Sequence, residues 1–99
     1  MNGSPGEYLV DIKVRLPGGL PADERQRLLA AELRRGKELR ANQAIQRIWR
    51  VPGALRNVGI WSATDATELH ELISSLPLFP YMEVAVTPLA VHPVESESQ

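Results

Sequence analysis

Hydrophobic and polar residues alternate in three stretches of the chain, and these three, together with residues 45–51, are expected to form β-strands. The first contains five apolar residues at every second position: Tyr8, Val10, Ile12, Val14 and Leu16. The others are expected at residues 45–51, 57–62 and 82–86. A period of two is typical of a strand that buries one face. The turn-forming segments Pro17-Gly18-Gly19 and Pro52-Gly53 end the first two strands.

In two other stretches the apolar residues recur every three to four positions, which predicts helices. Pro21 begins the first predicted helix, which continues to about Asn42 through residues that favour helices. Asp65 and Glu68 form a capping-box pattern that opens the second. The second helix is expected to bury four side chains, those of Leu69, Leu72, Ile73 and Leu76.

The resulting order of elements is β-α-β-β-α-β. In one small domain this order predicts an α+β, ferredoxin-like fold, with a four-stranded antiparallel sheet and both helices on one face. We expect a single domain over residues 1–99, with flexible ends at residues 1–7 and 94–99. Neighbouring large apolar residues such as Ile48 and Trp49 must point to opposite faces of the sheet. The face without helices is therefore expected to be a subunit interface.

Composition excludes several classes of protein. The 99 residues carry a net charge of -1, so no overall field favours nucleic acid or an anionic membrane. The absence of cysteine excludes disulfides, thiol nucleophiles and thiolate metal sites. The two histidines, His70 and His92, have no partners at metal-ligand spacing, so we expect no metal site. No apolar run is long enough for a membrane span, and a cytoplasmic location is expected.

The segment from Leu76 to Met82 is unusually apolar for a turn. It contains two prolines, which end the preceding helix, and three large side chains, those of Leu78, Phe79 and Tyr81. An exposed turn would be polar. This segment is therefore expected to be covered by the core of its own domain, by a ligand or by another subunit.

Glu32 is the strongest candidate for chemistry. On a helical wheel it falls within the apolar arc of the first helix, one turn from Leu28 and Gly36. A carboxylate in apolar surroundings has a raised pKa, which suits proton transfer. The alternative is a structural role, in which Glu32 pairs with a cation or reaches solvent. The candidate cations for such a pair are Arg25, Arg35 and Lys13.

Other polar residues are candidates for binding. Arg47, Arg50 and Arg56 lie on or beside strands, where an arginine could hold a carboxylate-bearing ligand. Asn57 could donate a hydrogen bond into a pocket or lie at a sheet edge. The charged runs at residues 24–27 and 34–37 are expected to be solvated helix faces. His70 is expected at a solvated helix edge, whereas a C-terminal segment carrying His92 could fold over a neighbouring subunit.

The string Leu76-Pro-Leu-Phe-Pro-Tyr-Met82 resembles the muconolactone isomerase family. The similarity extends through residues 69–72, Ile48-Trp49-Arg50 with Gly53 and Asn57, Leu16-Pro17 and His92-Pro93, and so covers nearly the whole chain. It implies a ferredoxin-like subunit in a decamer built from dimers, and a cofactor-free shift of a double bond in a lactone during aromatic catabolism.

The resemblance also implies roles for individual residues. Glu32 matches the family's helix glutamate and would be the acid/base catalyst, with Arg50 as the anion contact. Asn57 and His92 would be polar groups of the substrate pocket, and Phe79 and Tyr81 would form part of its wall. The chain departs from the family pattern at five positions: Asp11, Leu33, Ile45, Gly59 and Ala90.

These departures keep alternatives open. The chain could act on a related lactone or enolisable ring, or remove halide from a chlorinated lactone. It could also be a binding subunit without catalytic activity. A cofactor-free oxygenase of the dimeric α+β barrel type shares the same order of strands and is a third possibility.

Overall fold

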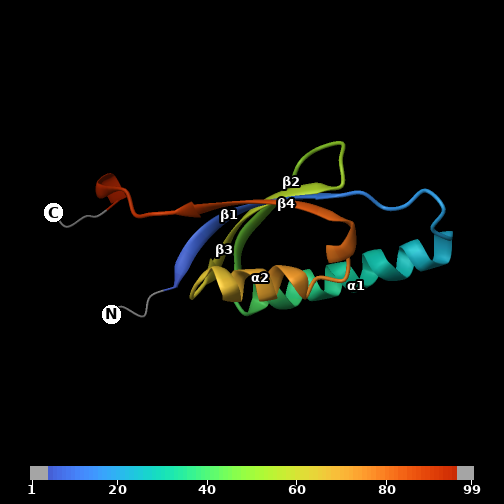
Figure 1. Cartoon of the computed structure of the whole chain (residues 1–99), viewed down its shortest axis with the longest axis horizontal. Helices are drawn as coiled ribbons and strands as arrows, with labels where there is room; N and C mark the ends of the chain where they lie inside the picture. Colours follow the sequence, from blue (N-terminus) through green and yellow to red (C-terminus); the bar gives the residue numbers. More distant parts are fainter. Residues whose placement is uncertain (1–4, 96–99) are drawn as a thin grey trace.

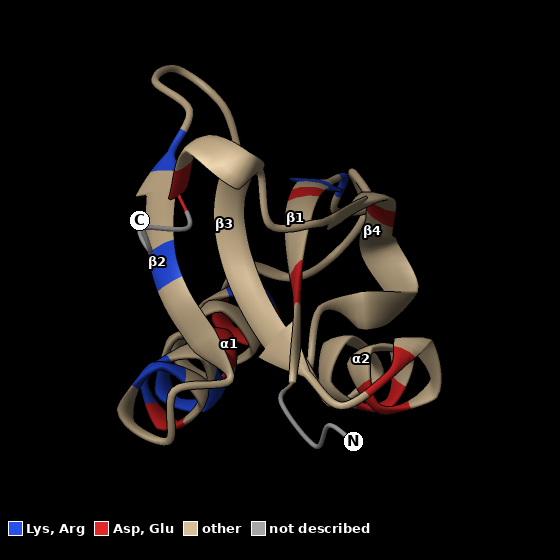
Figure 2. Ribbon diagram, turned by 90° about the vertical axis from the view of Figure 1, so that its left-hand side faces the viewer, with Lys and Arg blue, Asp and Glu red and all other residues tan. Residues whose placement is uncertain are grey.

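The computed structural model describes residues 5–95, which fold into two layers (Figure 1). The elements, in chain order, are β1 Gly6–Val14, α1 Ala22–Ala41, β2 Ile45–Arg50, β3 Arg56–Ala63, α2 Ala66–Ser74 and β4 Met82–Leu89. The strands form one antiparallel sheet in the order β2-β3-β1-β4. Both helices cover the same face of this sheet (Figure 2). The predicted ferredoxin-like α+β fold is confirmed.

The core lies between the sheet and the helices. Val10 and Ile12 of β1 and Trp61 of β3 point toward the helices and are buried. Leu39 of α1 and Leu69 of α2 pack against them from the other layer. Burial of this apolar surface is the main force that holds the two layers together.

The apolar segment between α2 and β4 folds back onto its own domain. Leu76 and Leu78 are buried, and the next residues form the 3-10 helix Phe79–Tyr81. Phe79 packs against the core and meets the ring of His70 edge-on, with 5.9 Å between ring centroids. At Leu76, Leu78 and Phe79, the segment is therefore covered by its own domain.

Helix α2 begins as the sequence predicts. The Asp65 side chain accepts a hydrogen bond of 2.9 Å from the backbone N–H of Glu68, and the Glu68 carboxylate accepts one from the backbone N–H of Thr64. These bonds satisfy backbone donors that the first turn of a helix leaves free. They fix the point at which the chain leaves β3 and returns toward β4.

The β2–β3 hairpin depends on two glycines. Gly53 in its turn has a φ of 82°, a conformation that residues with a Cβ atom disfavour. Gly59 of β3 pairs with Ile48 of β2, and a Cβ at Gly59 would lie 2.8 Å from the Arg47 carbonyl oxygen. Any larger residue at position 59 would therefore force β2 to shift.

The first strand is displaced from its predicted position. Gly6 and Glu7, expected in a flexible end, belong to β1, where Glu7 pairs with β3 and with β4. The strand ends at Val14, so Leu16 lies outside it; next to this end, the N–H of Arg15 donates to the Tyr81 carbonyl. Neighbouring strands that extend past Tyr8 make the earlier start possible. The predicted flexibility of residues 1–4 and 96–99 falls outside the described residues.

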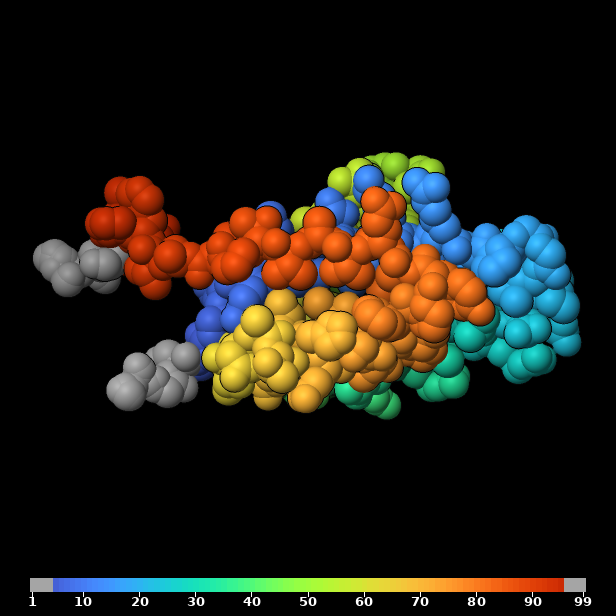
Figure 3. Space-filling model, in the orientation of Figure 1, coloured from blue at the N-terminus to red at the C-terminus, as the bar shows by residue number. Residues whose placement is uncertain are grey.

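The last described residues form an arm that extends from the body of the domain. Beyond β4, residues 90–95, here called the C-terminal arm, contain the short 3-10 helix Pro93–Glu95. Val91 and Val94 are 80% and 81% exposed. The arm extends clear of both layers (Figure 3). None of the helices in residues 5–95 is long and apolar enough to cross a membrane.

Candidate active site

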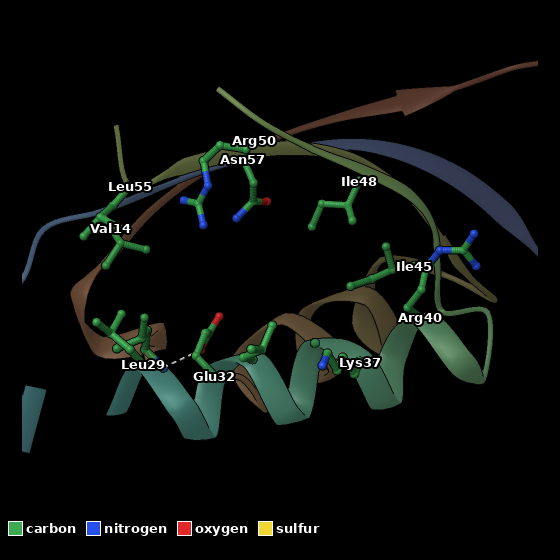
Figure 4. A pocket seen from close by; sticks show the side chains of 13 residues that line it. Val14, Leu29, Glu32, Lys37, Arg40, Ile45, Ile48, Arg50, Leu55 and Asn57 are labelled. Atoms are coloured by element: carbon green, nitrogen blue, oxygen red, sulfur yellow. Dashed lines mark hydrogen bonds between the residues drawn. The ribbon is translucent and has the colours of Figure 1, made fainter. Parts of the chain in front are cut away.

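A cleft of about 550 Å³ lies between α1 and the β2–β3 hairpin (Figure 4). Apolar side chains form most of its wall: Val14, Leu29, Leu33, Ile45, Ile48, Leu55 and Leu78. Five polar residues also line it, namely Glu32, Lys37, Arg40, Arg50 and Asn57. A mostly apolar cleft of this size with a few polar groups is typical of a small-molecule site.

The register of the sheet determines which residues reach the cleft. Arg50 of β2 pairs with Asn57 of β3, and Asn57 pairs with the buried Ile12 of β1 on its other side. Directly paired residues point to the same face, so Arg50 and Asn57 point toward the helices. On the opposite wall, Gly36 of α1 has no side chain, and a Cβ there would meet nothing within 4 Å. The cleft therefore stays open beside this turn of α1.

Glu32 projects from α1 into the cleft (Figure 4). Its Oε1 accepts a hydrogen bond of 2.9 Å from the backbone N–H of Leu78. Burial raises the pKa of this carboxyl group, and the hydrogen bond from Leu78 opposes part of that rise. The apolar turn after α2 thus orients the carboxylate through a backbone amide.

The alternative in which Glu32 forms an ion pair is not seen. Among residues 5–95, no salt bridge involves Glu32. Arg35 instead pairs with Glu38 at 2.9 Å and donates to the Ser75 hydroxyl. The predicted inward direction of Glu32 is confirmed, and its carboxylate is available for a ligand.

Arg50 and Asn57 point from the sheet into the cleft, on the side opposite Glu32 (Figure 4). Arg50 has one long hydrogen bond of 3.4 Å, from Nη1 to the Ala54 carbonyl oxygen. The side-chain oxygen of Asn57 is buried and has no hydrogen-bond partner in the described part of the chain. An unpaired buried polar atom costs about 1–3 kcal/mol. A ligand that hydrogen-bonds to Asn57 would remove this cost.

Three of the predicted substrate-binding residues do not line this cleft. Phe79 packs on the core, and Tyr81 lies at the end of the 3-10 helix. His92 is on the exposed C-terminal arm, where its Nδ1 accepts a hydrogen bond of 3.0 Å from the N–H of Val94. A single chain therefore brings together Glu32 and the polar residues of the sheet, but not these three.

The other two strand arginines belong to the open face of the sheet. Arg56 forms a two-pronged ion pair with Asp11, with distances of 3.0 and 2.7 Å, which lowers the pKa of the Asp11 carboxyl. Arg47 lies over the ring of Trp49, 5.0 Å from its centroid. Of the three arginines, Arg50 alone lines the cleft. Asp11 is on the face opposite the cleft of its own chain.

Lys37 and Arg40 border the cleft, although the sequence pattern assigns Lys37 to a solvated face. They lie next to Ile45, at the end of the cleft away from Leu55 and Val14 (Figure 4). The spacing of four residues from Leu33 places Lys37 on the same side of the helix, but this spacing alone does not distinguish the mouth of a cleft from a solvated face. Within residues 5–95, no cluster of three or more His, Asp or Glu side chains could hold a metal ion.

These features define a class of protein: a ferredoxin-like domain with one carboxylate in an apolar cleft, facing an arginine and an asparagine. Such a site suits proton transfer on a small anionic molecule. The family model for muconolactone delta-isomerase matches residues 7–95. The chain belongs to the muconolactone delta-isomerase family.

Individual relatives agree with this assignment. The chain is 42% identical to a muconolactone delta-isomerase of Cupriavidus pinatubonensis, over 87% of this chain and 94% of the relative. It is 36% identical to the Rhodococcus opacus protein of the same name, over 86% and 91%. A crystal structure of muconolactone isomerase matches with a TM-score of 0.85 at 28% identity, covering 94% of this chain and 97% of that chain. The family resemblance predicted from the sequence is confirmed.

Proposed function

We propose that this chain converts muconolactone into 3-oxoadipate enol-lactone, a step of the β-ketoadipate pathway of aromatic catabolism. The observation that carries the proposal is Glu32, held by the Leu78 amide in an apolar cleft opposite Arg50 and Asn57. The proposal is also supported by the similarity of this chain to muconolactone isomerases over most of its length.

The reaction moves one proton between two ring carbons. Glu32 removes the proton from the ring carbon that carries the acetate side chain, and the electrons of that C–H bond shift through the ring to the lactone carbonyl oxygen. The dienolate then takes the same proton back at the carbon next to the carbonyl. The double bond has moved by one position, and Glu32 is again ionised. A single carboxylate can serve as both base and acid because no net proton is gained or lost.

Arg50 and Asn57 would stabilise the dienolate. Negative charge develops on the lactone oxygen, and preorganised donors stabilise such charge most strongly where water is excluded. Both side chains reach the cleft from the sheet, opposite the carboxylate (Figure 4). The base and the oxyanion donors would therefore approach the ring from opposite sides.

Purified protein is expected to isomerise muconolactone under anaerobic conditions, as followed by ultraviolet absorbance. The base must be ionised in the free enzyme, and burial raises the pKa of Glu32. The acidic limb of the kcat/KM profile should therefore lie above the ordinary glutamate pKa of about 4.3. Assembled protein without turnover would contradict the proposed substrate, and turnover that requires oxygen would favour the oxygenase alternative.

We also propose that the chain acts as a homo-oligomer, a decamer built from dimers. Two exposed apolar regions of one chain support this. Trp49 on the open face of the sheet is 49% exposed, and Val91 and Val94 extend on the C-terminal arm. In an assembly the arm of one subunit could bring His92 to another, and Phe79 and Tyr81 could meet a neighbour. The binding roles of these three residues and a cytoplasmic location stay predictions.

Replacing Trp49 by glutamate is expected to break the assembly into smaller species. A carboxylate at position 49 would remove the apolar contact surface of Trp49 and would lose hydration in the interface, which is unfavourable even beside Arg47. Trp49 is outside the core of its own chain, so circular dichroism should be unchanged. Sedimentation velocity measures the result, with Arg34→Glu on the exposed side of α1 as the control. An unchanged oligomer would show that this face is not the interface.

A further inference from the structure

The cleft holds more positive charge than the proposed proton transfer uses. Three cationic side chains line it, those of Lys37, Arg40 and Arg50, against the one carboxylate of Glu32. The salt bridges found among residues 5–95 involve none of these three cations. Figure 2 shows Lys and Arg residues on β2 and, together with acidic residues, on α1, whereas α2 carries acidic residues. The cleft is thus suited to an anion, and its cations are free to bind one.

The cations are at two separate places. Arg50 comes from the sheet and lies above Glu32, whereas Lys37 and Arg40 come from α1 toward its C-terminal end (Figure 4). Lys37 is five residues beyond Glu32, which corresponds to about 7.5 Å along a helix axis. This spacing is comparable to the length of a five-membered ring that carries an acetate group. One substrate could therefore contact both places at once.

Lys37 lies on the outer side of α1, at the mouth of the cleft. Leu33, four residues earlier on the same side of the helix, is 60% exposed and covers the mouth of the cleft with apolar surface. Lys37 and Arg40 follow along that mouth, and Ile45 and Ile48 of the edge strand β2 form its other side. An apolar mouth with cations at one end suits a molecule that has an apolar ring and a charged tail.

We propose that Lys37, assisted by Arg40, binds the carboxylate of an anionic lactone and so sets its orientation. This inference rests on the proposed function, because it leaves Arg50 and Asn57 for the lactone oxygen. The tail carboxylate lies at the α1 end of the cleft, and the ring lies over Glu32. A neutral lactone lacks this contact and binds more weakly. Lys37 and Arg40 thus select the charge of the substrate without taking part in the proton transfer.

A binding experiment tests the inference without requiring turnover. The probes are the saturated lactone acid (5-oxotetrahydrofuran-2-yl)acetate, which has no double bond to move, and its methyl ester. Calorimetric titration compares the wild-type protein with Lys37→Met, Arg40→Met and the double variant. We expect the double variant to bind the acid at least about tenfold more weakly, as for loss of hydrogen bonds to a charged group. The affinity for the ester should be unchanged, and Lys37→Arg should retain affinity for the acid.

The controls separate a local contact from other causes. Arg34 is exposed on α1 and lines a different surface hollow, so Arg34→Met removes one positive charge, as each single variant does, without touching the cleft. The inference is wrong if Arg34→Met weakens acid binding as much, if acid and ester weaken together, or if the wild-type protein binds both probes equally. It is also wrong if Arg50→Met alone removes the preference for the acid. Protein that prefers the acid through Lys37 but does not isomerise muconolactone would contradict the proposed function and support this inference.

Discussion

Replacing Glu32 by glutamine is expected to lower kcat for muconolactone by about 10³-fold or more. The amide cannot accept the ring proton, and general acid–base groups contribute rate factors of up to about 10⁴. Glutamine has nearly the same shape as glutamate and keeps an oxygen that can accept the N–H of Leu78. The variant should therefore fold and assemble like the wild-type protein. Steady-state assays measure the loss, and sedimentation velocity checks the assembly.

Glu24→Gln is a matched control for this variant, because Glu24 is exposed in the first turn of the same helix. It should retain kcat. Stability gives a second check on Glu32. Burial raises its pKa in the folded state, so an ionised Glu32 opposes folding at neutral pH. The glutamine variant should be the more stable protein at pH 8, and the difference should disappear as the pH falls below the pKa of the unfolded chain. Full activity of Glu32→Gln would show that another group is the base.

The direction of Glu32 could be predicted from the sequence because it follows from helix periodicity alone. A residue one turn from Leu28 and from Gly36 must point to the same side of α1 as they do. The order of elements along the chain was equally predictable, since most strands show alternation, both helices show a period of three to four residues, and Pro and Gly follow the first two strands. What periodicity could not supply was the partner of the carboxylate. The Leu78 amide is 46 residues away and belongs to the backbone, which leaves no side-chain signal.

The cationic end of the cleft could not be predicted because it depends on the position of a strand. A helical wheel shows that Lys37 is outside the apolar arc, but a position outside the arc can face solvent or the mouth of a cleft. The position of the sheet determines whether such a residue faces solvent or the cleft. β2 is one of the two edge strands, so the outer side of α1 borders an opening and not another strand. The same limit applies to Phe79, whose apolar side chain fits either a pocket wall or the core against which it packs.

Arg50→Met is expected to lower kcat/KM by about 10²- to 10³-fold, the usual loss when one oxyanion donor is removed. Most of the loss should be in kcat, because charge develops on the lactone oxygen only as the proton leaves. Lysine should restore little activity, since it lacks the planar, forked donors of arginine. Steady-state kinetics on assembled protein separate the two parameters.

The matched control for Arg50 lies on the same strand. Arg47, three residues earlier, points to the opposite face and lies over Trp49. Arg47→Met should retain kcat in the assembled protein, so a loss confined to Arg50→Met assigns the effect to the cleft. A rise in KM with unchanged kcat for Arg50→Met would instead make Arg50 the anchor of the substrate carboxylate. That result would reverse the orientation of the lactone, placing its tail beneath the sheet and its carbonyl oxygen toward Lys37.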